Sequence, residues 1–179
     1  MLYVFGFERT GVVLSDLYFV DPNPLKGQES PEHGVRLEVR LLDRGELKGS
    51  NYSAQPIEIG RPVWRVDLLE SVDGAPGSFD RTHHHPGVKG WEPGRRVFDA
   101  GLSADPLGWL GSRLSDLEWL LGTAGLGGDP ADAGDAESLR QCLPEVLAAA
   151  GRLLSLVQAG ELGRPPASEP LASARASWL

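Results

Sequence analysis

The chain of 179 residues contains one cysteine, three lysines and four histidines, and these scarcities limit its chemistry. The single cysteine, Cys142, excludes an internal disulfide and a cysteine-based zinc site, which agrees with a reducing environment. No apolar run approaches the roughly 20 residues of a membrane-spanning helix. The first residues lack the basic and apolar regions of a signal peptide. We therefore expect a cytoplasmic protein with no membrane segment.

The chain also lacks an excess of positive charge. Its net charge is −8, and residues 33–98 carry ten basic and nine acidic side chains, a balance of +1. The other segments carry seven basic and sixteen acidic side chains, a balance of −9. Because affinity for phosphates comes mainly from clustered cations, general polyanion binding is not expected. Any contact with RNA would use the central segment.

Hydrophobic periodicity predicts an antiparallel sheet in the N-terminal half. Residues 35–41 alternate between apolar and mostly polar side chains, and residues 64–68 do the same. After residue 98 the period changes to that of a helix. Asp105 is a suitable N-cap, Pro106 suits the first helical position, and leucines recur at helical spacing to Leu121. The sequence thus predicts an α+β fold, an antiparallel sheet over residues 2–98 packed against an amphipathic helix over 106–121.

The C-terminal third predicts a helical appendage to this domain. The expected organisation is an α+β domain over residues 1–122, a flexible linker over 123–135, a helix over 136–160 and a disordered tail over 161–179. Pro144 lies inside the helix and predicts a kink or two shorter helices. Because a glycine-rich segment precedes it, the apolar stripe of residues 139–157 is expected to bind a protein partner or a second copy of the chain.

Three of the four histidines are consecutive. His83, His84 and His85 hold most of the groups that titrate near neutral pH or bind a borderline metal. In a strand, Arg81, His83 and His85 would share one face. No HExxH, P-loop, Rossmann glycine set or nucleophile elbow occurs elsewhere. This segment is therefore the candidate site.

The histidine segment supports three interpretations. In the first, His83 and His85 bind a divalent metal such as zinc, with Asp80 or His33 completing the ligand set. In the second, no cofactor is needed: one histidine acts as general base and another as general acid, while Arg81 or Arg36 stabilises developing negative charge. In the third, the histidines form a polar loop that packs beside Trp91 and has no chemical role.

A surface for substrate is predicted beside the histidines. Trp91 lies in a Gly/Pro-rich loop next to Arg95 and Arg96, a combination that suits stacking on bases and contact with phosphates. Together with Arg36, these three side chains are the candidate substrate-binding residues.

The order of these signals resembles the TumE-like toxins of bacterial toxin–antitoxin systems. The resemblance covers roughly residues 10–121 and lies in short motifs followed by a leucine-rich helix. The motifs are His33-Gly34-Val35-Arg36-Leu37-Glu38-Val39, Leu41-Leu42-Asp43, Gly49-Ser50-Asn51, Asp80-Arg81-Thr82-His83-His84-His85 and Arg96-Val97-Phe98-Asp99. It implies a compact α+β unit that attacks RNA, with His83, His85 and Asp80 as site residues. The chain departs from the family in a longer insertion around residues 53–78, its His-His-His-Pro run and its added C-terminal helix.

The leading functional hypothesis is a toxin-like ribonuclease. His83 and His85 would act with Arg81 and Asp80 on an RNA substrate, with or without a divalent metal. The alternative is a non-enzymatic protein-interaction module, an antitoxin or accessory subunit in which the histidine loop is structural.

Overall fold

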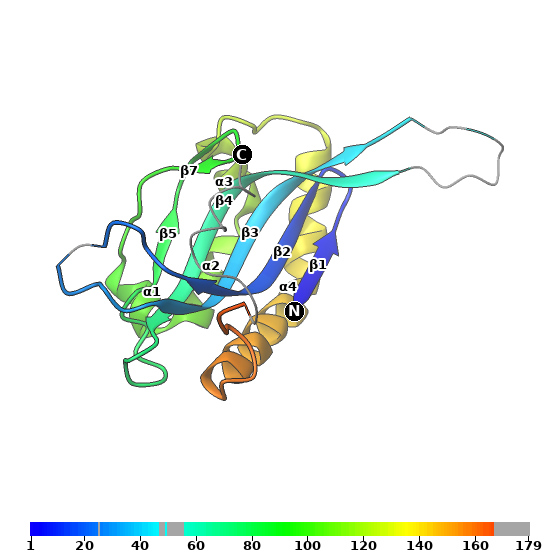
Figure 1. The fold of residues 1–179 in the computed structure, drawn as a ribbon. Coiled ribbons are helices and arrows are strands. Elements are labelled where there is room, and N and C mark those ends of the chain that lie inside the picture. The colour runs from blue at the N-terminus through cyan, green and yellow to red at the C-terminus, as the bar shows by residue number, and fades with distance from the viewer. Residues whose placement is uncertain (25, 47–48, 50–55, 167–179) are drawn as a thin grey trace.

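Five strands form one antiparallel sheet in which each strand pairs with the next along the chain. The structure, a computed structural model, describes residues 1–24, 26–46, 49 and 56–166. The sheet has the order β1-β2-β3-β4-β5 (Figure 1). Its strands are β1 (Leu2–Gly6), β2 (Thr10–Phe19), β3 (Glu32–Arg44), β4 (Ile57–Ser71) and β5 (His83–His85). Two short strands, β6 (Val88–Lys89) and β7 (Glu92–Pro93), form a separate hairpin after β5.

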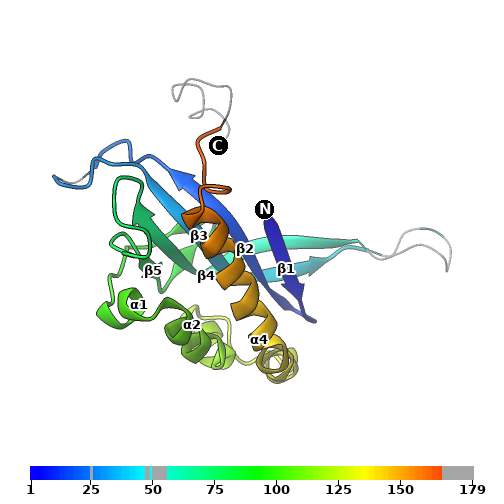
Figure 2. The same cartoon turned by 90° about the horizontal axis from the view of Figure 1, so that it is seen from below.

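The helices follow the sheet in sequence and cover one of its faces (Figure 2). They are α1 (Ala100–Ala104), α2 (Pro106–Leu114), α3 (Leu117–Thr123) and α4 (Ala131–Gln158). The α+β class, with an antiparallel sheet packed against helices, is therefore confirmed. In the described residues, no helix combines the length and apolar character that a membrane span requires.

Strand alternation gives the sheet two chemically different faces. The face toward the helices is apolar and packs with their leucines into one core. It contributes Val12, Leu14, Val35, Leu37, Val39, Trp64, Val66 and Leu68. The opposite face of β3, β4 and β5 is polar, because the intervening positions carry charged or imidazole side chains. These residues are Arg36, Glu38, Arg40, Arg65, Asp67, His83 and His85.

The prediction of one continuous helix over residues 106–121 is wrong, because two helices occupy this range. α2 ends at Leu114, and α3 begins at Leu117 with Asp116 as its N-cap. The Asp116 carboxylate accepts a hydrogen bond from the Trp119 backbone N–H at 3.1 Å. Aspartate stabilises a helix start by this contact, so it favours a new helix over continuation of the first.

The C-terminal helix is part of the main core, which corrects the prediction that its apolar stripe binds another chain. α4 begins at Ala131, inside the stretch predicted as linker, and is one helix that contains Pro144. Its apolar side chains pack on the sheet and on α2 and α3. The buried members are Ala136, Leu139, Val146, Ala149, Ala150, Leu153, Leu154 and Val157. The apolar stripe of residues 139–157 is thus buried against the chain's own sheet and helices.

A buried carboxylate explains why α4 starts early despite its polar first turns. Asp135 accepts hydrogen bonds from the backbone N–H groups of Glu8, Arg9 and Thr10, at 2.8, 3.1 and 2.8 Å, and from the Thr10 hydroxyl at 2.8 Å. These bonds fix the start of α4 to the β1–β2 turn. Past α4, the Gly163 N–H donates to Asp16 at 3.1 Å, while residues 167–179 of the predicted tail lie outside the described residues.

Candidate metal centre

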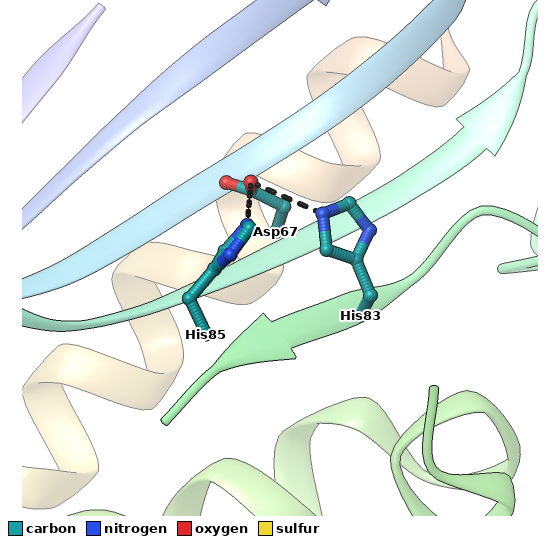
Figure 3. Close-up of side chains that lie close together, drawn as sticks. All are labelled: Asp67, His83 and His85. Carbon is teal, nitrogen blue, oxygen red and sulfur yellow. Dashed lines mark ion pairs between the residues drawn. The ribbon is translucent and has the colours of Figure 1, made fainter. Parts of the chain in front are cut away.

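The pairing of β4 with β5 brings an aspartate and two histidines together. Asp67 lies opposite His83, and Arg65 lies opposite His85. Because side chains alternate along a strand, His83 and His85 point to the polar face together with Asp67 (Figure 3). His84 points to the other face, where its ring lies 5.1 Å from that of Trp109. The prediction that alternate histidines share a face is therefore confirmed.

Three possible metal-ligand atoms converge in this cluster. Asp67 Oδ2 lies 3.6 Å from His83 Nε2 and 3.6 Å from His85 Nε2 (Figure 3). One ligand atom from each residue lies within 4.8 Å of the other two. The residues are buried, with 2%, 1% and 5% of the surface of Asp67, His83 and His85 exposed. The cluster is an interior feature of the polar face.

Backbone carbonyls determine which nitrogen of each imidazole faces the aspartate. His83 Nδ1 lies 2.8 Å from the Arg81 carbonyl oxygen, and His85 Nδ1 lies 2.7 Å from that of Gly94. A carbonyl oxygen only accepts, so each Nδ1 carries a proton that it donates. In the neutral ring, Nε2 is then unprotonated and presents a lone pair. The Nε2 atoms of both rings therefore face the carboxylate oxygen of Asp67.

Burial keeps the histidine next to Asp67 neutral. It lowers the pKa of His83 to about 4, although the Arg81 carbonyl and the negative charge of Asp67 act in the opposite direction. Burial also lowers the pKa of His84. Near neutral pH, His83 is therefore a neutral imidazole rather than a cation that would neutralise Asp67.

Arg36 supplies the positive charge that Asp67 needs in its buried position. Its Nε donates to Asp67 Oδ1 at 2.7 Å and its Nη2 to Oδ2 at 3.1 Å. Burial alone would raise the pKa of Asp67, but the interactions with His85 and Arg36 outweigh it and hold this pKa well below its usual range. Asp67 is therefore a carboxylate near neutral pH.

The distance of each imidazole from the Asp67 oxygen suits a small transition-metal ion. Ligand distances of about 2.0–2.1 Å around a tetrahedral zinc place neighbouring ligand atoms about 3.3 Å apart. The two Asp67–histidine distances of 3.6 Å are close to this value. The hydrogen bonds from each Nδ1 to a carbonyl are those that typically orient metal-bound histidines.

Several predicted site residues lie outside the cluster. Asp80 instead accepts hydrogen bonds in the turn after β4, from the Ser71 N–H at 2.8 Å and from the Ser71 and Ser78 hydroxyls at 3.0 and 3.1 Å. Neither Asp80 nor His33 belongs to the cluster; His33 Nε2 lies 3.8 Å from a Glu70 oxygen.

The arginine expected beside the histidines approaches them only through its backbone. The Arg81 carbonyl accepts from His83, whereas its guanidinium donates to the Gly27 carbonyl at 3.1 Å. The same guanidinium lies 3.9 Å from Glu32. The side chain of Arg81 therefore points toward the start of β3.

The predicted substrate-binding residues are separated from one another. Arg36 is bound to Asp67. Trp91 is 64% exposed, and the guanidinium of Arg40 lies 5.4 Å from the centre of its ring. Arg95 is exposed, whereas Arg96 is half-buried, 3.7 Å from Asp21. Trp91 and Arg95 therefore remain on the surface, and half-buried Arg36 is bound to the Asp67 carboxylate of the cluster.

Asp67 is the candidate ligand that the sequence patterns do not reveal. It lies at a polar position of the alternating strand at residues 64–68, and the alternation alone does not say what that position contacts. A signal did exist, since the strand predicted at residues 35–41 places Arg36 on its own polar face. Only the register, which pairs Arg36 with Asp67 and Asp67 with His83, unites them.

Comparisons of the chain with protein family models, curated proteins and solved structures found no match. The resemblance to TumE-like toxins stays a prediction. The function is therefore argued from the site itself.

The neutral state of His83 predicts that stability falls in mild acid. Between pH 6.5 and about 4, the unfolded chain binds a proton on His83 that the folded chain does not, so the free energy of unfolding rises with pH in this window. Between pH 7 and 5 the loss should be about 2 kcal/mol. Urea unfolding with a chelator present measures it.

The matched variant for this measurement is His83→Gln. It should show a shallower pH dependence over the same range, with the remainder due to His84, whose pKa shifts in the same direction. Equal slopes in the two proteins would show that His83 is not the group responsible.

Proposed function

We propose that this protein binds one divalent transition-metal ion, zinc or a similar ion, through Asp67, His83 and His85. The observation that carries the proposal is the convergence of the two Nε2 atoms on a carboxylate oxygen 3.6 Å from each. The lone pair of neutral His83 and the negative carboxylate of Asp67 repel each other in the interior, and a cation between them removes the repulsion. The Nδ1–carbonyl hydrogen bonds orient both rings for this role.

The ligand set favours particular ions. Two imidazoles suit zinc, copper, nickel and iron, whereas calcium and magnesium need mainly oxygen ligands. Both Nε2 atoms lie 3.6 Å from Oδ2 of Asp67, while Oδ1 is held by Arg36 Nε, so this carboxylate would offer an ion one oxygen, Oδ2. We therefore expect binding of zinc-like ions and no measurable binding of calcium or magnesium.

The position of the site supports a structural role for the ion. It would join β4 to β5 and, through the Gly94 carbonyl, to the segment that follows β5. Three protein ligands leave a fourth position, as in catalytic zinc sites. The burial of both rings limits that position to a small ligand such as water.

Burial also explains why metal binding is favoured over RNA cleavage. A general acid or base must come within hydrogen-bond reach of its substrate, and rings exposed by 1% and 5% offer RNA little access. Two surface hollows lie in the helical part, one lined by Ser112, Arg113, Asp116 and Trp119, the other around the α3–α4 loop, and neither contains a cluster residue. The ribonuclease function, like the alternative of a protein-interaction module, stays a prediction.

Zinc titration of the full chain tests the proposed function. Chelator-stripped protein should bind one Zn²⁺ in competition with a chromophoric chelator. At a free zinc concentration of about 100 times Kd, the gain of about 2.7 kcal/mol should raise Tm by roughly 5–10 °C.

Single histidine variants show whether the zinc lies in the cluster. His83→Ala and His85→Ala should each lose the zinc-dependent rise in Tm. His33→Ala, which removes a histidine outside the cluster, should retain it. A wild-type chain without zinc binding, or binding that survives both cluster variants, would contradict the proposal.

A further inference from the structure

Arg36 and a metal ion would share the same oxygen of Asp67. Arg36 lies opposite Asp67 on the neighbouring strand β3, and its forked contact reaches both carboxylate oxygens. Oδ2, the oxygen that faces both Nε2 atoms, accepts from Arg36 Nη2 at 3.1 Å. Oδ1 accepts from Arg36 Nε at 2.7 Å. The guanidinium therefore lies directly beside the position proposed for the ion.

This contact changes the charge of the site. Asp67 and Arg36 together are neutral, so a divalent ion would keep its full charge in a buried position next to a guanidinium. Two like charges in this surrounding repel each other much more strongly than in water. Without an ion, Arg36 neutralises Asp67 and allows the carboxylate to stay buried. One side chain therefore favours the metal-free state and opposes the metal-bound one.

The other arginines of this face are neutralised differently. Arg65, opposite His85, and Arg40 both donate to Glu38, each through Nε at 2.7 Å. Glu38 thus lies between two arginines, whereas Asp67 has Arg36 as its bidentate partner. Arg65 is accordingly a matched control: an arginine of the same face, next to the cluster, that does not bond the metal-ligating carboxylate.

We infer that Arg36 is the residue that sets metal affinity, acting as an internal cation that competes with the metal for Asp67 and makes the site exchangeable. The inference rests on the proposed function, since it concerns the same three ligands. Arg36 would affect the ion only through its hydrogen bonds to Asp67 and would not contact the ion itself.

Substitutions that separate charge from hydrogen bonding test the inference, with Zn²⁺ as the probe. Arg36→Gln keeps a hydrogen-bond donor but removes the charge, and its zinc affinity should rise roughly tenfold or more. Arg36→Lys keeps the charge, and its affinity should stay within about threefold of the wild type, as should that of Arg65→Gln. Chelator competition measures all four proteins, and thermal unfolding without metal shows whether each is folded.

Each result decides the inference. An equal or weaker zinc affinity in folded Arg36→Gln, or an equal rise in Arg65→Gln, overturns it. If Arg36→Gln is unfolded without metal, added zinc should refold it by neutralising Asp67, and failure to refold also overturns the inference. Zinc binding by Arg36→Gln but not by the wild type would support Arg36 as the competitor while refuting the proposed function. Absence of binding in both proteins refutes both.

Discussion

Deleting residues 131–179 should leave a chain that does not fold. The deletion removes α4, whose buried side chains fill the space over β2 and β3 and beside α2 and α3. Seven of them are apolar side chains in the core that the sheet shares with the helices: Ala136, Leu139, Val146, Ala150, Leu153, Leu154 and Val157. Full burial of one valine or leucine contributes about 1.5–3 kcal/mol. For the five valine and leucine side chains these losses amount to about 7.5–15 kcal/mol, as large as the total stability of an ordinary domain, about 5–15 kcal/mol.

The polar contacts of α4 would be lost as well. Without Asp135, the N–H groups of Glu8, Arg9 and Thr10 lose their carboxylate acceptor. The apolar face of the sheet, including Val12, Leu14 and Leu37, would become exposed. We expect aggregation, or a soluble product that binds hydrophobic dyes and shows no cooperative thermal transition.

A truncation after Pro166 is the control for this deletion. It keeps α4 and the contact of Gly163 with Asp16, and it should melt like the full chain. A soluble, cooperatively melting chain of residues 1–130 would instead show that α4 is a separate appendage. In that case residues 139–157 would again be candidates for a partner interface.

The sheet could be predicted from sequence because its signal is local. Alternation over residues 35–41 and 64–68 reflects one face in the core and one polar face, and both strands occur as predicted. The spacing of His83 and His85 likewise follows from strand geometry alone. The break between α2 and α3 was harder to predict, because the helical spacing of leucines continues past Asp116, the residue that caps α3.

The position of α4 and the third member of the cluster depend on contacts between distant segments. Asp135 looks like a linker residue until its hydrogen bonds with the β1–β2 turn, 125–127 residues away, are known. Asp67 lies sixteen residues before His83. Asp80 was the natural choice in sequence because it is nearby, but its side chain caps the turn beside Ser71. Sequence proximity therefore selected Asp80, whereas the carboxylate that converges with the two histidines is that of Asp67.

The second large effect is expected from replacing Asp67, and replacing Asp80 is its control. Asp67→Ala should abolish zinc binding and destabilise the metal-free protein by about 3 kcal/mol, because it leaves the mostly buried charge of Arg36 unpaired. Asp80→Ala should cost about 1 kcal/mol through its lost hydrogen bonds. It should leave zinc affinity unchanged. Urea unfolding and chelator competition on the three proteins measure both quantities.

A double variant separates the loss of stability from the loss of the metal ligand. Replacing both partners, Arg36→Met with Asp67→Leu, removes the unpaired charge and should recover most of the stability lost in Asp67→Ala, since apolar pairs often replace buried ion pairs at little cost. It should not recover zinc binding, because the carboxylate oxygen is still missing. A double variant that binds zinc as the wild type does would show that Asp67 is not a ligand. If Asp67→Ala were as stable as Asp80→Ala, the Arg36–Asp67 ion pair would contribute little to the stability of the metal-free protein. The competition proposed for Arg36 would then lose its physical basis.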